Sequence, residues 1–95
     1  MIDFEWDEAK RLVNLELHKL DFVNIVEFDW ESAWVSADIR REYGEDRYIA
    51  FGRFRERLTV LVFTIRKKNM RTVSWRKAND REQKAYGTRA QGRSE

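Results

Sequence analysis

The segment Leu58-Thr-Val-Leu-Val-Phe-Thr-Ile65 is apolar or β-branched on both faces of an extended chain. A strand of this kind needs neighbours that cover both sides, so we expect it to be central in a sheet. Further strand segments lie at residues 34–39, 47–54 and 71–77, and the short polar connections between the four have lengths typical of hairpins. The second half of the chain is therefore predicted to form an antiparallel sheet.

The first third of the chain has a different periodicity. Residues 2–6 alternate apolar and acidic side chains, as in a short strand with one buried face. Asp7 follows as a helix N-cap, and the spacing of apolar residues predicts a helix over residues 8–19. The core-facing stripe of this helix is predicted to contain Ala9, Leu12, Val13, Leu17 and Leu20.

Two shorter helices complete the predicted fold. Asp21 can cap the first, whose inward-facing residues are predicted to be Phe22, Ile25 and Val26. Asn79 with Glu82 three residues later is the pattern of a cap with a returning carboxylate, and this last helix is expected to end at about residue 86. The predicted order is β-α-α-β-β-β-β-α, an α+β fold in which helices cover one face of an antiparallel sheet and leave the other face open.

The length of 95 residues fits one domain, which we place at residues 1–86, with residues 87–95 as a loose polar tail. Cysteine is absent, which excludes disulfides and thiolate metal sites, and no histidine cluster has metal-ligand spacing. We therefore expect neither a metal nor a cofactor. The sequence has no leader-like start and no apolar run of membrane-spanning length, so we predict a soluble cytoplasmic protein that makes no membrane contact.

Charge is divided unequally along the chain. Residues 1–38 carry a net charge of −7 and residues 39–95 a net charge of +9, within a total of +2. A basic half of this kind indicates contact with a polyanion such as a nucleic acid. A glycine-rich phosphate loop and a nucleophile elbow are both absent from the sequence, so nucleotide-driven chemistry is not expected.

The last two strands of the sheet contain the candidate phosphate site. If a three-residue loop joins them, Thr64 lies opposite Thr72. One face then carries two arginines among small hydroxyls, namely Arg66, Thr64, Thr72, Ser74 and Arg76. Arginine binds phosphate oxygens in a bidentate manner, and hydroxyls donate to the others. A two-residue loop would exchange the faces of one strand relative to the other, and a solvated basic edge is the alternative interpretation.

His18 is the single histidine of the chain, and histidine is the residue type best suited to proton exchange near neutral pH. It shares one helix edge with Lys10 and Asn14, at intervals of four residues. The lysine can tune the imidazole, and the amide can orient the imidazole or a substrate. A structural role for this histidine is the alternative.

The segment 38–47 is dense in ionisable groups. Such a segment is usually a solvated turn held by ion pairs. It can instead place Glu45 beside the basic sheet face as a carboxylate base. Hydrogen-bond donors to that face would then be Arg40, Tyr43 and Arg47.

A series of short motifs runs along the chain: Phe4-Glu5-Trp6-Asp7, Lys10, Asn14, His18, Asp21-Phe22, Arg40, Tyr43-Gly44-Glu45, Arg47, Gly52, Val62-Phe63-Thr64, Arg66, Ser74, Arg76-Lys77-Ala78, Glu82 and Tyr86. Their order and spacing over about residues 4–86 resemble those of the BrnT-type ribonuclease toxins of bacterial type II toxin–antitoxin modules. Where that family usually reads Lys-His-Gly, this chain has Leu17-His18-Lys19. Trp75 stands where a small residue is expected.

The resemblance implies a fold similar to that of RelE-like toxins and metal-independent cleavage of RNA. It also implies neutralisation by a BrnA-like antitoxin that carries a DNA-binding domain. The complex of the two proteins would bind its own promoter DNA, mainly through the antitoxin.

With the resemblance, the residues above lead to a hypothesis of mechanism in which the RNA 2′-hydroxyl attacks the adjacent phosphorus. Arg66 and Arg76 would stabilise the charge on the phosphorane. His18 would move a proton, with Glu45 or Tyr43 as a substitute. The residues expected to hold the RNA are Lys10, Arg40, Arg47, Lys77 and Tyr86. A non-catalytic nucleic-acid-binding module and a protein-interaction module are the alternatives.

Overall fold

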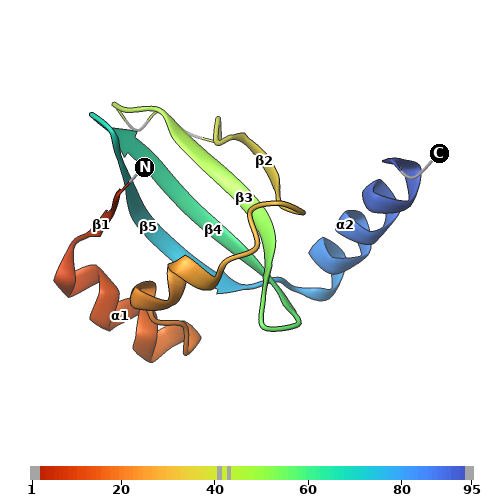
Figure 1. Cartoon of the computed structure of the whole chain (residues 1–95), viewed down its shortest axis with the longest axis horizontal. Coiled ribbons are helices and arrows are strands. Elements are labelled where there is room, and N and C mark those ends of the chain that lie inside the picture. Colours follow the sequence, from red (N-terminus) through yellow and green to blue (C-terminus); the bar gives the residue numbers. More distant parts are fainter. Residues whose placement is uncertain (1–2, 41, 43, 94–95) are drawn as a thin grey trace.

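The structure, a computed structural model of the chain, describes residues 3–40, 42 and 44–93. Its elements are, in order, β1 (Asp3–Trp6), α1 (Glu8–His18), η1 (Phe22–Glu27), β2 (Trp34–Ala37), β3 (Arg47–Phe54), β4 (Arg57–Arg66), β5 (Asn69–Lys77) and α2 (Asp80–Arg93). The predicted α+β class is confirmed (Figure 1). The second predicted helix is the 3₁₀ helix η1, and the Asp21 side chain caps it by accepting a hydrogen bond from the Val23 amide.

The described strands form one five-stranded mixed sheet in the order β1-β5-β4-β3-β2 (Figure 1). β4 lies in the middle, as its two-sided apolar sequence predicts. β1 runs parallel to β5, with Asp3 opposite Asn69 and Trp6 opposite Thr72. The prediction of a purely antiparallel sheet is therefore wrong for this pair. No hairpin joins these two strands, since most of the chain lies between them, and hairpin length could not indicate their direction.

The β4–β5 hairpin turns through two residues, Lys67-Lys68, instead of the predicted three. Thr64 consequently pairs with Arg71, so the predicted pairing of Thr64 with Thr72 is wrong. Because the register is shifted by one residue, Thr72 lies on the helix-covered face of the sheet, where it is buried. Its hydroxyl makes no hydrogen bond within the part of the chain that the structure describes.

An irregularity in the β4–β5 ladder restores the predicted pairing further along the hairpin. Phe63 pairs with Thr72, and the next pair is Val62 with Ser74, so Val73 forms a bulge between them. Beyond the bulge, Arg76 lies opposite Val60. Arg66, Thr64, Ser74 and Arg76 thus share one face as predicted, and Thr72 does not.

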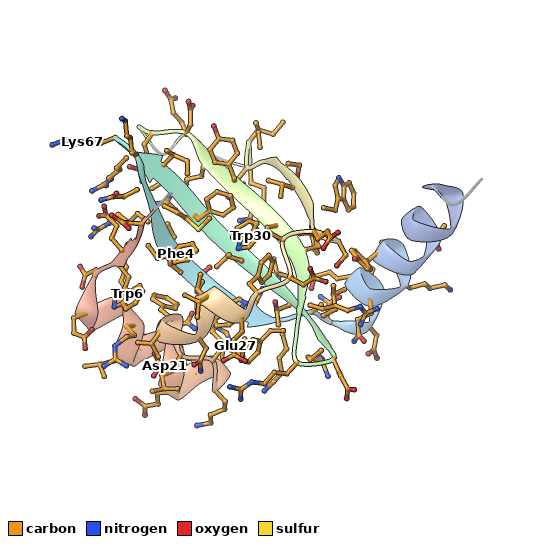
Figure 2. The ribbon with its side chains drawn as sticks, viewed as in Figure 1. Phe4, Trp6, Asp21, Glu27, Trp30 and Lys67 are labelled. Atoms are coloured by element: carbon orange, nitrogen blue, oxygen red, sulfur yellow. The ribbon has the colours of Figure 1, made fainter. Side chains whose placement is uncertain are left out.

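The core lies between the sheet and a layer formed by α1 and η1. Its buried hydrophobic residues are Leu20, Phe22, Ile25, Phe28, Ala50, Phe54, Leu61, Phe63, Met70 and Trp75. Phe4, Trp6 and Trp30 pack against this cluster (Figure 2). Trp75 is fully buried, and its indole N–H donates to the Thr59 hydroxyl at 2.9 Å. Since the indole of a buried tryptophan needs an acceptor, this bond secures the centre of the core.

α1 does not present the predicted apolar stripe to the core. Leu12, Val13 and Leu17 are 53%, 57% and 69% exposed, so that prediction is wrong for the helix itself. Val26 of η1 is also exposed, against expectation. The buried residue of α1 is Asn14, because hydrogen bonds to the backbone of β5 fix the rotation of the helix.

α2 begins with the predicted reciprocal cap. The Glu82 amide donates to the Asn79 side chain at 2.8 Å, and the Asn79 amide donates to the Glu82 carboxylate at 2.9 Å. The helix continues to Arg93 and projects away from the sheet (Figure 1). The prediction that it ends near residue 86 is therefore wrong, and residues 87–93 of the predicted tail are helical.

Tyr86 ties α2 to the sheet face opposite α1 and η1. It packs against a small cluster formed by Leu58, Val60, Ala78, Ile49 and Phe51. The prediction that all helices cover one face is thus correct for α1 and η1 and wrong for α2.

Candidate functional site

The sheet face opposite α1 and η1, the open face, presents Thr64 and Arg66 of β4 together with Ser74 and Arg76 of β5. Its basic residues form two separate groups, one around Arg76 and one around Arg66. Val60, the partner of Arg76, lies six residues before Arg66 on β4, which corresponds to roughly 20 Å along the strand. The two groups therefore lie at opposite ends of the open face.

Arg76 forms a bidentate ion pair with Glu82. Its Nη1 and Nη2 atoms lie 2.8 and 2.7 Å from the two carboxylate oxygens. This hydrogen-bonded guanidinium holds the pKa of Glu82 below its ordinary value, and the nearby charge of Arg40 acts in the same direction. Glu82 in turn raises the pKa of Arg76. Both side chains are therefore charged near neutral pH.

A pocket of about 320 Å³, the Arg76 pocket, lies beside this ion pair. Its lining consists of Arg40, Ile49, Phe51, Val60, Val62, Ser74, Arg76 and Glu82. Arg40 is held at the pocket by Asp38, whose buried carboxylate accepts hydrogen bonds from Arg40 Nε at 2.8 Å and Nη2 at 2.9 Å. The pocket thus combines two ion-paired guanidinium groups, the Glu82 carboxylate and a hydroxyl with apolar side chains. Guanidinium and hydroxyl donors beside apolar surface suit a phosphate attached to a base or sugar.

A second hollow of about 460 Å³, the α1 groove, lies between α1 and β5. Its lining consists of Ala9, Lys10, Val13, Asn14, Leu17, His18, Val73 and Ser74. Lys10 and His18 therefore share one hollow, as their spacing predicts. Because Ser74 lines both the α1 groove and the Arg76 pocket, the two hollows meet at this side chain.

Asn14 is fully occupied by structural hydrogen bonds. Its side-chain amide donates to the carbonyls of Trp75 at 2.7 Å and Leu20 at 3.1 Å, and its oxygen accepts from the Trp75 amide at 3.0 Å. The structure thus gives Asn14 a role in attaching α1 to β5 rather than the predicted role of orienting His18 or a substrate.

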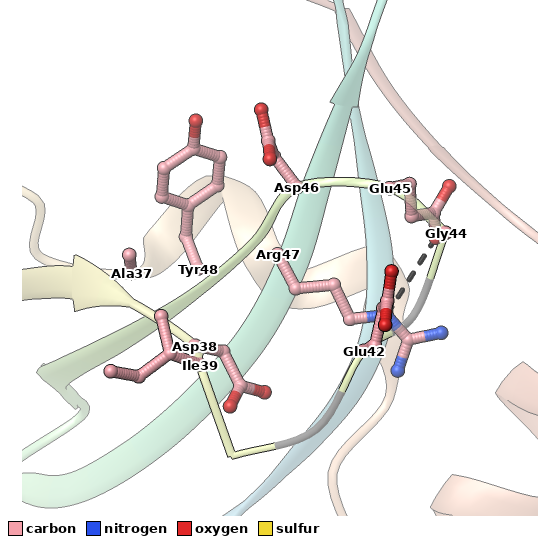
Figure 3. A pocket seen from close by; sticks show the side chains of 9 residues that line it. All are labelled: Ala37, Asp38, Ile39, Glu42, Gly44, Glu45, Asp46, Arg47 and Tyr48. Atoms are coloured by element: carbon pink, nitrogen blue, oxygen red, sulfur yellow. Dashed lines mark ion pairs between the residues drawn. The ribbon is translucent and has the colours of Figure 1, made fainter.

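The second basic group surrounds Glu45. Its carboxylate accepts a hydrogen bond from Arg66 at 3.0 Å. It also lies 3.6 Å from Arg47 Nε, an ion pair marked in Figure 3. The hydrogen bond from Arg66, helped by the charge of Arg47, holds the pKa of Glu45 below its ordinary value. A carboxylate stabilised in this way is a weakened base, which argues against the predicted base role of Glu45. Tyr43, the other predicted substitute, lies outside the described residues.

An open hollow of about 730 Å³ adjoins Glu45 (Figure 3). Its lining consists of Ala37, Asp38, Ile39, Glu42, Gly44, Glu45, Asp46, Arg47 and Tyr48. Nearby on the same face, Glu5 accepts hydrogen bonds from Arg71 at 2.7 Å and Asn69 at 3.0 Å. The bonds from Asn69 and Arg71 lower the pKa of Glu5. This end of the open face therefore consists of paired charges rather than a uniform basic patch.

Arg66 and Arg76 are directed to different places by their carboxylate partners. Glu45 holds Arg66 at one end of the open face, and Glu82 holds Arg76 at the other. The prediction that both arginines stabilise one phosphorane does not fit this geometry. The arrangement fits two phosphates of one extended nucleic-acid strand, with one phosphate at each end of the open face.

The two remaining predicted contact residues point elsewhere. Lys77 is exposed at the end of β5, opposite Thr59, and so lies on the other side of the strand from Arg76, as expected. Tyr86 donates from its hydroxyl to the Ser32 carbonyl at 2.7 Å. Its ring also lies 5.8 Å from the Arg53 guanidinium. Tyr86 thus anchors α2, whereas the sequence suggested a contact to RNA.

Sequence reasoning missed three charged residues of the open face. Glu82 is visible in the sequence only as a helix cap, and its bond to Arg76 depends on where α2 starts. Glu5 and Arg71 meet because β1 is parallel to β5, which the sequence did not indicate. Correct hairpin register would have placed Arg71 on the open face, so the length of the Lys67-Lys68 turn was the missing signal.

Among the residues that the structure describes, no three His, Asp or Glu side chains are grouped as metal ligands would be. Within the same ranges, no helix combines the length and apolar character needed to cross a membrane.

Comparison with protein families matches residues 6–82 to the model described as ribonuclease toxin, BrnT, of type II toxin-antitoxin system. The matched range begins at the last residue of β1 and ends at Glu82, so it contains Lys10, His18, Arg40 and Arg76. No curated protein matches the chain.

Proposed function

Since the chain belongs to the BrnT family of ribonuclease toxins of type II toxin–antitoxin systems, we propose that it cleaves RNA without a metal ion where the Arg76 pocket meets the α1 groove. The observation that carries this proposal is the position of Ser74, which lines both hollows. A phosphate held at Ser74 would have Arg76 and Arg40 on one side. Lys10 and His18 would lie on the other.

The proposed reaction is an internal transfer within the RNA. The 2′-hydroxyl oxygen forms a bond to the adjacent phosphorus, and the bond from phosphorus to the next 5′-oxygen breaks. A base accepts the 2′-hydroxyl proton, and an acid donates a proton to the leaving 5′-oxygen. The products are a 2′,3′-cyclic phosphate and a 5′-hydroxyl, and no external nucleophile is consumed.

Arg76 is the proposed stabiliser of the charge that develops on the phosphorane oxygens. A guanidinium has five N–H donors, and Glu82 accepts from two of them while fixing the plane of the group. One well-placed donor of this kind lowers the barrier by about 3 kcal/mol. Arg40, which is itself ion-paired with Asp38, supplies a second guanidinium group to the same pocket.

His18 is the proposed proton carrier, and Lys10 is the proposed contact to a neighbouring phosphate. Both line the α1 groove on the far side of Ser74 from Arg76. Glu45 is not assigned a proton-transfer role, because Arg66 holds it as a carboxylate at the other end of the open face.

The wider biology of this proposal follows the family. We propose a BrnA-like antitoxin as the neutralising partner, promoter DNA contact through that antitoxin, a RelE-like fold and a cytoplasmic location. The match to a toxin of a toxin–antitoxin system supports the partner, since such a system pairs the toxin with an antitoxin.

The test is cleavage of a synthetic RNA by the purified chain in excess EDTA. We expect products with 2′,3′-cyclic phosphate ends and no cleavage of the same oligonucleotide carrying a 2′-deoxy substitution at the cut site. Arg76→Ala and His18→Ala should each lower the rate by about 10²-fold. Arg55→Ala is the matched control, because Arg55 is also ion-paired, to Glu27 at 3.0 Å, on the turn between β3 and β4.

Cleavage that requires an added divalent metal would contradict the metal-independent mechanism. Equal losses in Arg76→Ala and Arg55→Ala would show that the site is misplaced. Tight RNA binding with no cleavage under any condition would favour the non-catalytic nucleic-acid-binding module instead.

A further inference from the structure

Three apolar side chains of α1 outside the core form one wall of the α1 groove, namely Ala9, Val13 and Leu17. Val13 and Leu17 are 57% and 69% exposed, and Ala9 lies one turn before Val13 on the same side of the helix. Val73 contributes an apolar side chain from β5. The groove therefore offers an apolar strip that follows the helix axis for two turns, which matches the contact made by the apolar face of an amphipathic helix.

The polar groups of the groove are cationic or neutral. Lys10 and His18 line it, and Arg76 lies two residues beyond Ser74 on β5. Glu16 is on α1 as well, but the helical spacing places it on the side of Val13 away from Lys10. A complementary occupant would thus carry carboxylates beside its apolar residues.

We propose that the α1 groove is the docking site of the antitoxin, through an acidic amphipathic helix whose apolar face covers Val13 and Leu17. This inference rests on the proposed function, since the partner comes from the toxin–antitoxin class and the catalytic site is the one proposed at Ser74, His18 and Arg76. The occupant lies over His18 and Lys10 and reaches Ser74. The antitoxin then neutralises the toxin because its helix directly covers the proposed catalytic site.

Exposure of the apolar strip also fits a protein that is bound to a partner in its inhibited state. Val13 and Leu17 are left in water in the free chain, and their burial on binding removes apolar surface from solvent, which favours the complex. RNA requires no such strip, because the contacts that bind its backbone are charges and hydroxyls.

The experiment measures affinity for the antitoxin of the same module by calorimetry, using the purified full chain. Val13→Glu/Leu17→Glu should weaken binding by at least 30-fold, because each new carboxylate is buried against an acidic helix. Val23→Glu/Val26→Glu is the matched control. It makes the same change at two exposed valines of η1, 48% and 71% exposed, outside the groove, and it should bind within about twofold of wild type.

A second measurement needs no substitution. His18 is the only histidine in the chain, so its imidazole protons give one identifiable set of NMR signals in a chain labelled selectively at histidine. Saturation with unlabelled antitoxin should shift these signals and slow their exchange with solvent. Unchanged His18 signals in the saturated complex would overturn the inference, whether or not the groove variant folds.

The remaining outcomes also test the docking proposal. Equal affinity of the groove variant and wild type for the antitoxin would overturn the inference. A groove variant that loses affinity only for a non-cleavable 2′-deoxy RNA analogue would also overturn it, because the groove would then bind RNA. A groove variant that changes only the oligomeric state of the free chain would overturn it too, because the groove would then bind a second copy of the chain. Cleavage by the wild-type chain without antitoxin is scored separately, so a failure of the proposed ribonuclease activity is distinguishable from a failure of the docking site.

Discussion

The side chain of Asn14 acts as a short extra strand against Trp75. Its amide donates to the Trp75 carbonyl at 2.7 Å and accepts from the Trp75 N–H at 3.0 Å, the two bonds that a neighbouring strand would make. β1 pairs with β5 only as far as Thr72, so the edge of β5 is open beyond that point. Asn14 closes this edge and places α1, with Lys10 and His18, beside Ser74.

Asn14→Ala should destabilise the protein by about 2–4 kcal/mol, because it leaves the buried N–H and C=O of Trp75 without partners. Urea unfolding followed by tryptophan fluorescence measures this change. Asn14→Asp keeps the acceptor for the Trp75 amide but turns a carboxylate oxygen toward two carbonyls, so it should also destabilise. A stable Asn14→Ala variant would mean that another group holds α1 to β5.

Lys19→Gly should stabilise the protein by about 0.5–1 kcal/mol. Lys19 is the C-cap of α1 in a left-handed conformation, with φ 60°, where a side chain is strained and glycine is not. The control is Lys10→Gly, within the same helix, which should destabilise by about 1 kcal/mol. Thermal unfolding of both variants gives the comparison, and equal destabilisation would contradict the strain argument.

The stability of the protein should fall as the pH drops below the ordinary pKa of glutamate. The pKa of Glu82 is lowered in the folded state by Arg76. A lowered carboxyl pKa contributes stability above the unfolded-state value, and that contribution is lost as the pH falls through the folded-state value. Glu82→Gln removes this contribution, so it should be less stable than wild type at about pH 7, and the difference should narrow by about pH 3. Chemical unfolding at both pH values measures it, and a gap that widens in acid would contradict the sign.

Arg66→Ala and Arg76→Ala should affect RNA cleavage in different ways. Arg66 lies at the end of the open face distant from Arg76, where we assign it to a phosphate away from the cut site. Its loss should raise KM, leave kcat unchanged and reduce the salt slope of RNA binding by about 1. Loss of Arg76 should lower kcat by about 10²-fold. Steady-state kinetics at several salt concentrations separate the two, and identical kinetic changes would place both residues at one phosphate.

Much of the local structure was predictable from the sequence because it depends on groups a few residues apart. Asp7 and Asp21 each cap the helix that follows, and Asn79 with Glu82 forms the reciprocal cap of α2. The central position of β4 was predictable because a strand that is apolar on both faces is stable only between neighbours. Of the site, the shared edge of Lys10 and His18 and the shared face of Ser74 and Arg76 were predictable for the same local reasons.

The tertiary structure decided the features that depend on distant parts of the chain. Thr72 lies on the covered face because the hairpin takes a two-residue turn and recovers its register through a bulge at Val73. Two-residue and three-residue turns have similar local cost, so the packing of the whole sheet decides between them. Glu5 meets Arg71 because β1 is parallel to β5. Asn14 rather than the leucines of α1 is buried because the open edge of β5 needs hydrogen-bond partners. Sequence periodicity reports only how hydrophobic residues are spaced along the chain. The need to pair exposed backbone groups arises only once the sheet has formed.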